Sequence, residues 1–539
     1  MNLTVPLAGA PAAPAAAVPA PRLTLSTLQK VALPLGAVLF DVLFWHERMA
    51  LNMLLYTLFV VGATLVGLPR HAPQWRAWPF WATLAGTLLS AGCVAWYGSG
   101  AARLASVSSL AVWLGYLNQP QLRLVAYALL TALTNAARVL PGLTGLLRLP
   151  HNAGSRLGRA WFYGRLLAVP LLALLVFHGL FVAANPRYAA LSGRALAALG
   201  EWLGRLFVDF SVLHALFIAL GVALTGAALL RVPVHYFLDQ ESRLGEFIRR
   251  QRDRVASFGV RRPDFRPQRF RALDLRKEYL VALSLLSLVN ALLLAVNVID
   301  INWLWFGFRP APDFDLTQFV HEGTYVLILS ILVAMGVVLW FFRRNLNFYQ
   351  RGLPALRWLA TVWVLQNGVL AVSVGLRNYY YILYTGLAYK RIGVYGFLLL
   401  TFFGLVTVLL KIWQRRSAYS LVRLNAWAAY ALLLAFAVGN WEIWIARYNL
   451  RPQLQTLDYG FLLDMPDRVL PVLAAHQHVL PQRRLVHETE YGTWEPLPAA
   501  EAQARLRQRL QQFRAAQQAR RWPSYTWADW QAYSAVLIK

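Results

Sequence analysis

The feature that most constrains this chain is a series of apolar runs, each long enough to cross a lipid bilayer. The run from Phe319 to Phe342 holds about 24 residues, which as a helix is roughly 36 Å long and exceeds the thickness of a hydrocarbon core. Similar runs recur along most of the chain and predict an all-α polytopic membrane protein. We expect about eleven transmembrane helices, at 29–46, 50–68, 79–97, 101–117, 162–184, 211–231, 279–299, 319–342, 355–375, 392–412 and 421–444.

The composition agrees with this class, because 58% of the 539 residues are hydrophobic and only 14% are charged. The formal net charge of +28 does not indicate a nucleic-acid partner. Most Lys and Arg lie in short segments between the apolar runs, where they act as topology signals under the positive-inside rule. The lone cysteine, Cys93, lies inside an expected span, so an intramolecular disulfide is excluded.

The basic segments set the expected orientation and the domain boundaries. The segment between Arg231 and Lys277 is strongly basic, so we expect it, and with it the N-terminus, to be cytoplasmic. Residues 1–28 are rich in Ala and Pro and are expected to be disordered. Residues 29–446 then form the membrane domain, with a cytoplasmic loop at 232–278, and residues 447–539 form a small extracytoplasmic domain.

Two further helices are expected to lie in the membrane interface. Residues 121–150 look helical, but a full span there would place the following arginines outside, so we favour an interfacial or re-entrant helix. If this segment spans, the count rises to twelve and the N-terminal orientation reverses. A second interfacial helix is expected at 187–205, on the outer side.

Ionisable side chains near the membrane mark a candidate site, since burying a charge in lipid is costly. His321 and Glu322 open the run 319–342, Asp300 precedes it, and Arg377 follows the next span, where it can pair with either acid. Two simpler interpretations stay open. His321 and Glu322 can be hydrated at the level of the lipid headgroups as part of a helix cap, and the intramembrane amides can form hydrogen bonds between helices. The candidate outward-facing polar cavity comprises Asp300, His321, Glu322, Gln366, Asn367, Arg377 and Asn378.

An alternative enzyme site involves Asp41 and Glu47, near the first outer turn. Membrane glycosyltransferases that use polyprenyl-linked sugars place a catalytic carboxylate in their first outer loop, so Asp41 is a candidate general base. Solvated loop acids are the simpler interpretation. We expect no metal site, because His476 and His478 lack the spacing that puts two ligands on one helix face. No cofactor motif is present either.

Several short motifs resemble one family. They are the run from Val320 to Ser330, Gln366-Asn367, Arg377-Asn378, the run from Gly386 to Val394, and Asn440-Trp441. On these the chain resembles the bacterial polytopic inner-membrane proteins, in the form found in Bacteroidetes, that are grouped only as a domain of unknown function. The resemblance runs from about Leu39 to the C-terminus. It implies a bacterial inner-membrane location and implies no reaction.

We therefore expect a non-enzymatic role, either transport of a solute or lipid or envelope sensing, through the polar cavity. The alternatives are a lipid-carrier-dependent transferase that uses Asp41, or a scaffold subunit of a membrane complex. Membrane lipids are the expected partners, with an anionic lipid or a protein bound at the basic loop between Arg231 and Lys277. No nucleic acid and no cofactor are expected.

Overall fold

The computed structural model describes residues 25–146, 170–249, 272–306 and 316–537, with breaks at 171–173, 176, 180, 183, 207–210, 344, 351, 453, 455 and 489–493. Most of the expected span at 162–184, and residues 250–271 of the basic loop, therefore lie outside the described residues. Up to residue 438 the described elements are almost all helices. Their bounds are α1 (Thr27–Phe44), α2 (Leu51–Val66), α3 (Trp78–Tyr97), α4 (Gly100–Asn118), α5 (Val125–Leu146), α7 (Pro186–Leu206), α8 (Val212–Leu229), α9 (Tyr236–Ser242), α10 (Ala272–Asp300), α11 (Leu316–Phe341), α12 (Leu353–Thr385), α13 (Tyr389–Gln414) and α14 (Ala418–Val438).

Seven helices in the described residues are long and apolar enough to cross a membrane. They are α1, α3, α8, α10 with the short π-helix that follows it, α12, α13 and α14. Their presence supports a polytopic membrane protein. The finer count of eleven spans stays a prediction, as do the two interfacial helices.

The chain divides into two compact units. Unit 1 comprises residues 1–45, 60–68 and 133–233, and unit 2 comprises residues 46–59, 69–132 and 234–539. Because the boundaries fall inside α2 and α5, each of these helices contributes one part to each unit.

Unit 1 is built on the antiparallel pair α1 and α8. Ser26 and Gln29 form a capping box at the start of α1, which satisfies backbone donors that a helix N-terminus leaves free. At the other end, Phe40 packs against Gly221. There an added Cβ would lie 2.7 Å from the Phe40 ring, so the small residue allows this close approach of α8.

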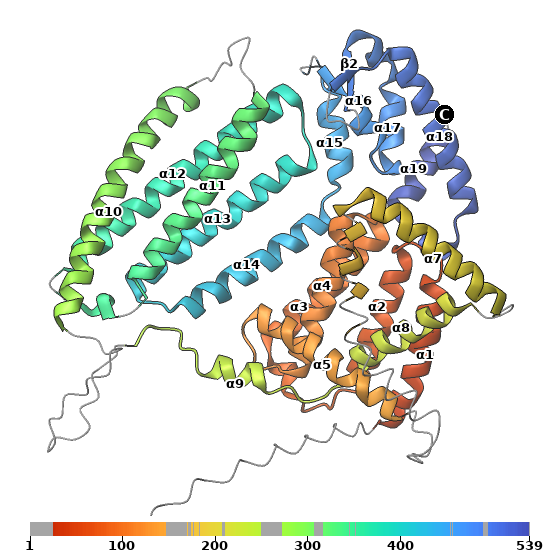
Figure 1. The fold of residues 1–539 in the computed structure, drawn as a ribbon, viewed down its shortest axis with the longest axis horizontal. Coiled ribbons are helices and arrows are strands. Elements are labelled where there is room, and N and C mark those ends of the chain that lie inside the picture. The colour runs from red at the N-terminus through yellow and green to blue at the C-terminus, as the bar shows by residue number, and fades with distance from the viewer. Residues whose placement is uncertain are drawn as a thin grey trace, which may run out of the picture. The chain divides into compact units, whose positions relative to one another are not determined.

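Unit 2 contains the bundle of α10, α11, α12 and α13, which lie side by side in green to cyan in Figure 1. Their apolar side chains form one buried cluster that includes Leu286, Val338 and Leu356. The hydrogen bonds from Asn290 to Leu359 and from Asn297 to Gln366 advance by seven residues on both helices. The helices α10 and α12 therefore run parallel, with a heptad register.

The helices α3 and α4 form a hairpin in the same unit. Gly98 ends α3 with a φ of +60°, in the left-handed region that favours glycine, and Ser99 caps α4 by accepting a hydrogen bond from Ala102. On the other face of α3, Gly86 leaves room for the Tyr430 hydroxyl of α14. The turn between α3 and α4 is thus held in a defined shape.

The C-terminal region, residues 441–537, has its own buried core and a small sheet that the sequence did not lead us to expect. Strand β1 pairs in parallel with β2, and β2 pairs antiparallel with β3. Tyr459, Leu470 and Phe513 are among the buried core residues. The elements are α15 (Trp441–Asn449), β1 (Thr456–Asp458), α16 (Tyr459–Leu463), α17 (Leu470–Ala475), β2 (Arg484–Glu488), β3 (Trp494–Pro496), α18 (Ala499–Ala519) and α19 (Trp527–Leu537).

Candidate functional site

The structure pairs two of the predicted site residues. Asp300, at the end of α10, and Arg377, in α12, form an ion pair of 2.7 Å, with side chains 6% and 10% exposed. The helix α12 runs on to Thr385, so Arg377 and Asn378 lie within the helix and not beyond its end, as the expected span at 355–375 implied. The apolar run ends earlier, but the helix continues because polar side chains on its buried face find partners.

The predicted amides form hydrogen bonds to the same helix or to a neighbouring one. The Nε2 of Gln366 donates to Asn290 of α10 at 2.9 Å. Asn367 donates to Trp363 in its own helix, and Asn378 donates to Arg391 in α13. The bonds of Gln366 and Asn378 are of the interhelical kind that we named as the simpler interpretation, whereas the bond of Asn367 lies within its own helix. A role for these residues in lining a solute path stays a prediction.

The remaining predicted residues fall in separate places. His321 and Glu322 lie in α11, but their side chains lie outside the described part. Asp41, in unit 1, accepts a hydrogen bond of 2.8 Å from the imidazole of His214, on which Trp45 stacks. Glu47, in unit 2, accepts a hydrogen bond of 2.5 Å from the Ser524 hydroxyl. The two acids of the alternative enzyme site therefore belong to different units.

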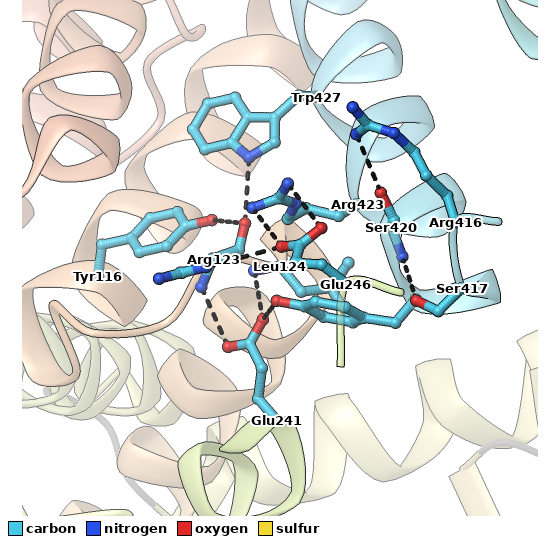
Figure 2. Close-up of polar contacts among 11 residues, drawn as sticks. Tyr116, Arg123, Leu124, Glu241, Glu246, Arg416, Ser417, Ser420, Arg423 and Trp427 are labelled. Carbon is cyan, nitrogen blue, oxygen red and sulfur yellow. Dashed lines mark hydrogen bonds and ion pairs between the residues drawn. The ribbon is translucent and has the colours of Figure 1, made fainter. Parts of the chain in front are cut away.

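A second polar cluster joins three chain segments of unit 2 (Figure 2). The carboxylate of Glu241, in α9, accepts hydrogen bonds from the backbone amides of Arg123 and Leu124 at 3.0 and 2.9 Å, and from the Tyr419 hydroxyl at 2.7 Å. Because Arg123 and Leu124 directly precede α5, the buried acid lies at a helix N-terminus, where a negative charge is favoured. Glu246 adds an ion pair of 3.0 Å to Arg423.

A cavity of about 510 Å³ lies where the C-terminal region meets the α3–α4 turn. Arg468 donates to the backbone carbonyl of Tyr97, and the Thr526 side chain packs on Gly98. A second cavity, of about 470 Å³, lies beside Glu47 and shares Arg48 and Arg520 with the first. Both cavities are formed entirely within unit 2. We call the larger one the arginine cleft, because five arginines line it.

Three of these five arginines are matched by carboxylates. Their ion pairs are Arg468 with Glu442 at 2.5 Å, Arg509 with Asp467 at 3.0 Å, and Arg520 with Asp529 at 2.8 Å. The Asp467 carboxyl is removed from water, so burial raises its pKa, and the charge of Arg509 offsets only part of that rise.

The other two arginines, Arg48 and Arg103, also line the cleft. Within the described residues neither guanidinium has a carboxylate at ion-pair distance, and the buried Nε of Arg103 has no hydrogen-bond partner. Arg103 lies in the first turn of α4, and Ser99 and Gly100 at that helix N-terminus line the same cavity. Four carboxylates line the cleft with these five arginines, the fourth being Asp464. The remaining excess of positive charge, beside a helix N-terminus, favours an anion in the cleft.

The cleft lies beside an exposed cluster of tryptophans. Trp96 of α3 contacts Trp527 of α19, with ring centroids 5.8 Å apart, and Trp527 contacts Trp530 at 5.1 Å. All three rings are exposed. Exposed tryptophans at the end of an apolar helix are typical of the level of lipid headgroups.

Sequence reasoning missed this cleft, although one signal was visible. The short motif Gly98-Ser99-Gly100 lies just before Arg103 in the sequence, but we did not connect the two. The other lining residues come from the turn before α2 and from the C-terminal region, and no local sequence pattern links these segments. No group of three metal-ligating side chains occurs in the parts of the chain that the structure describes.

Together, the apolar helices and the polar contacts at their ends define an integral, multi-pass membrane protein. The chain belongs to the family described as Domain of unknown function (DUF4153), which it matches over residues 49–476. This confirms the resemblance to a family known only as a domain of unknown function, whereas the bacterial origin and the inner-membrane location stay predictions. Comparison with curated proteins and with solved structures finds no match.

Proposed function

We propose that the arginine cleft binds the phosphate-bearing headgroup of a lipid. The proposal is carried by Arg48 and Arg103, which line one cavity and have no carboxylate at ion-pair distance in the described chain. A guanidinium binds phosphate oxygens in a bidentate manner, and this makes arginine the preferred residue for such groups. The volume of about 510 Å³ lies within the range of small-molecule sites.

The neighbouring tryptophans favour a lipid over a soluble anion. They suggest that the cleft opens at headgroup depth, where a membrane phosphate is present at high local concentration. Such binding serves transport of a lipid or sensing of the envelope. In this proposal the protein lies in a bacterial inner membrane with the C-terminal region outside, and it binds without catalysing a reaction.

The test measures lipid binding to the full-length protein in nanodiscs of phosphatidylcholine containing increasing phosphatidylglycerol. We expect Arg48→Gln and Arg103→Gln each to weaken phosphatidylglycerol binding about tenfold, the value for loss of roughly 1.4 kcal/mol from a charge-assisted contact. Arg505→Gln is the matched control, because Arg505 is exposed on α18 and pairs with Glu501 away from the cleft. Unchanged binding in both cleft variants would overturn the proposal.

A second readout is the pH dependence of the same binding. Because burial raises the pKa of Asp467, this acid becomes neutral on acidification before an exposed aspartate does. Below its raised pKa it no longer competes for Arg509, so binding of phosphatidylglycerol should tighten as the pH falls. Asp467→Asn should bind as tightly at neutral pH as the wild type does in acid, and should lose this dependence.

A further inference from the structure

A third cavity, separate from the arginine cleft, lies in the C-terminal region. Its volume is about 590 Å³, and its lining includes Arg447, Arg451, His476, His478 and Arg483. Among the described residues that line it there is no carboxylate. A concave site that gathers cationic and imidazole groups without a counter-charge is unfavourable when empty, since like charges repel.

One of these side chains has a structural role. The guanidinium of Arg483 donates to the backbone carbonyls of Asn449 and Leu450 at 3.2 and 2.8 Å. These carbonyls end α15, and a cation there satisfies acceptors that the helix leaves free. Burial lowers the pKa of Arg483, but arginine stays charged. Arg483 is therefore held in place against the end of α15, where it lines the cavity and adds positive charge to it.

The arginines on α15 and just after it remain available. Arg447 and Arg451 are four residues apart and both are exposed. The guanidinium of Arg451 lies 5.2 Å from the ring centroid of Tyr448, a cation–π contact that orients the side chain and leaves its N–H groups free. Neither side chain has an ion pair within the described part of the molecule.

Two histidines, His476 and His478, also line the cavity. The Nδ1 of His476 donates to the backbone carbonyl of Val472 at 2.8 Å, so its Nε2 is the nitrogen left for a ligand. The ring of His478 is stacked near it, with centroids 6.3 Å apart. Arginines close by disfavour a metal cation, and two imidazoles are too few for a zinc site.

We propose that this cavity binds a phosphate group, held by Arg447 and Arg451 and accompanied by the His476 imidazole. The chemistry is that of a phosphate monoester or diester, since guanidinium groups pair with two phosphate oxygens at once. The source is either a soluble phosphate compound or a second lipid headgroup. Trp444, exposed on the same helix as Arg447, lies close enough in the chain to serve as an interfacial anchor for the latter.

The experiment uses the full-length protein and two probes. In detergent, pyrophosphate is titrated by calorimetry, and in nanodiscs, phosphatidylglycerol is compared with phosphatidylcholine. We expect the double variant Arg447→Gln with Arg451→Gln to weaken binding of the effective probe about tenfold or more. Pyrophosphate binding identifies a soluble ligand, and a response to phosphatidylglycerol alone identifies a lipid; either supports the proposal.

Controls separate this site from the arginine cleft and from loss of fold. Arg505→Gln with Arg507→Gln removes two charges from exposed positions of α18, in the same region, and should bind both probes normally. The cleft double variant Arg48→Gln with Arg103→Gln should retain the binding lost in Arg447→Gln with Arg451→Gln. The proposal is wrong if neither probe binds, or if the Arg447 and Arg451 double variant binds as the wild type does while melting at the wild-type temperature.

Discussion

At the scale of single residues, the ion pair between Asp300 and Arg377 is a costly polar feature of the helical bundle. Both side chains are almost fully buried, so each ion has lost most of its hydration. The attraction between them offsets that loss only while both are present. One oxygen, Oδ2 of Asp300, has no hydrogen-bond partner in the described residues, which adds to the cost of burying this carboxylate.

We predict that Asp300→Asn lowers the free energy of unfolding by about 3–5 kcal/mol, because the guanidinium of Arg377 is then buried without its counter-ion. The double variant Asp300→Asn with Arg377→Gln should lose less than Asp300→Asn alone. Unfolding in mixed detergent micelles measures both. The control is Glu501→Gln, whose exposed pair with Arg505 should contribute about 0.5 kcal/mol or less. A double variant less stable than the single one would contradict this account.

At the scale of elements, two kinds of contact hold helices together. Between α10 and α12 the heptad register places amides opposite backbone carbonyls, as Asn290 and Asn297 show. In the cluster around Glu241, one carboxylate joins the start of α5 to Tyr419 of α14 (Figure 2). The contacts between α10 and α12 fix the register of two parallel helices. The contacts of Glu241 hold the start of α5 next to the start of α14.

We predict that Glu241→Gln destabilises the protein by about 1.5–3 kcal/mol, since an amide NH₂ then faces backbone donors that the carboxylate satisfied. Glu246→Gln should cost about 1 kcal/mol or less, because Glu246 is 27% exposed and its pairs are partly screened. Thermal unfolding compares the two variants. Hydrogen exchange at the amides of Arg123 and Leu124 should rise in Glu241→Gln alone; equal effects in both variants would show that the contact to these amides carries no special weight.

At the scale of the molecule, contacts within unit 2 show which turns between its helices lie on the same side as the C-terminal region. The C-terminal region bonds to the turn before α2, through Leu51 and Tyr525 at 3.2 Å, and to the α3–α4 turn through Arg468. It also bonds to the α12–α13 turn, where Leu387 donates to Asn449 at 2.6 Å. The opposite ends of these helices lie on the other side, where Glu241 and Glu246 form their hydrogen bonds and ion pairs with the start of α5 and with α14. The positive-inside rule then predicts which side is cytoplasmic.

We predict that a cysteine at position 507 reacts with an impermeant thiol reagent in right-side-out membrane vesicles, whereas a cysteine at 121 reacts only in everted ones. Both positions are exposed, and Cys93 is buried, so the substitutions are made in a Cys93→Ala background. Protein in detergent, where both sites should react, is the control for accessibility. The reverse pattern would place the C-terminal region in the cytoplasm and would invert the proposed outward cleft.

Local sequence was sufficient to place most of the described helices. Each residue in an apolar run indicates its own burial in lipid without reference to distant residues. The ends of α3 and α13 were therefore predicted within three residues. The extension of α12 to Thr385 was missed, because there the buried face is polar and its partners Asp300 and Arg391 lie on other helices. The strands were missed because each is too short to show an alternating pattern.

The sequence by itself determined that this is a multi-pass helical membrane protein, since burial in lipid demands long apolar helices wherever they occur. It also placed Asp300 and Arg377 in one candidate polar site, with Glu322 as the other possible partner of the arginine. Only the tertiary structure decided where unmatched positive charge collects. Arg48 and Arg103 come from two different turns of the chain and line one cavity with residues of the C-terminal region. Whether such a charge has a counter-ion depends on the neighbours that folding brings together.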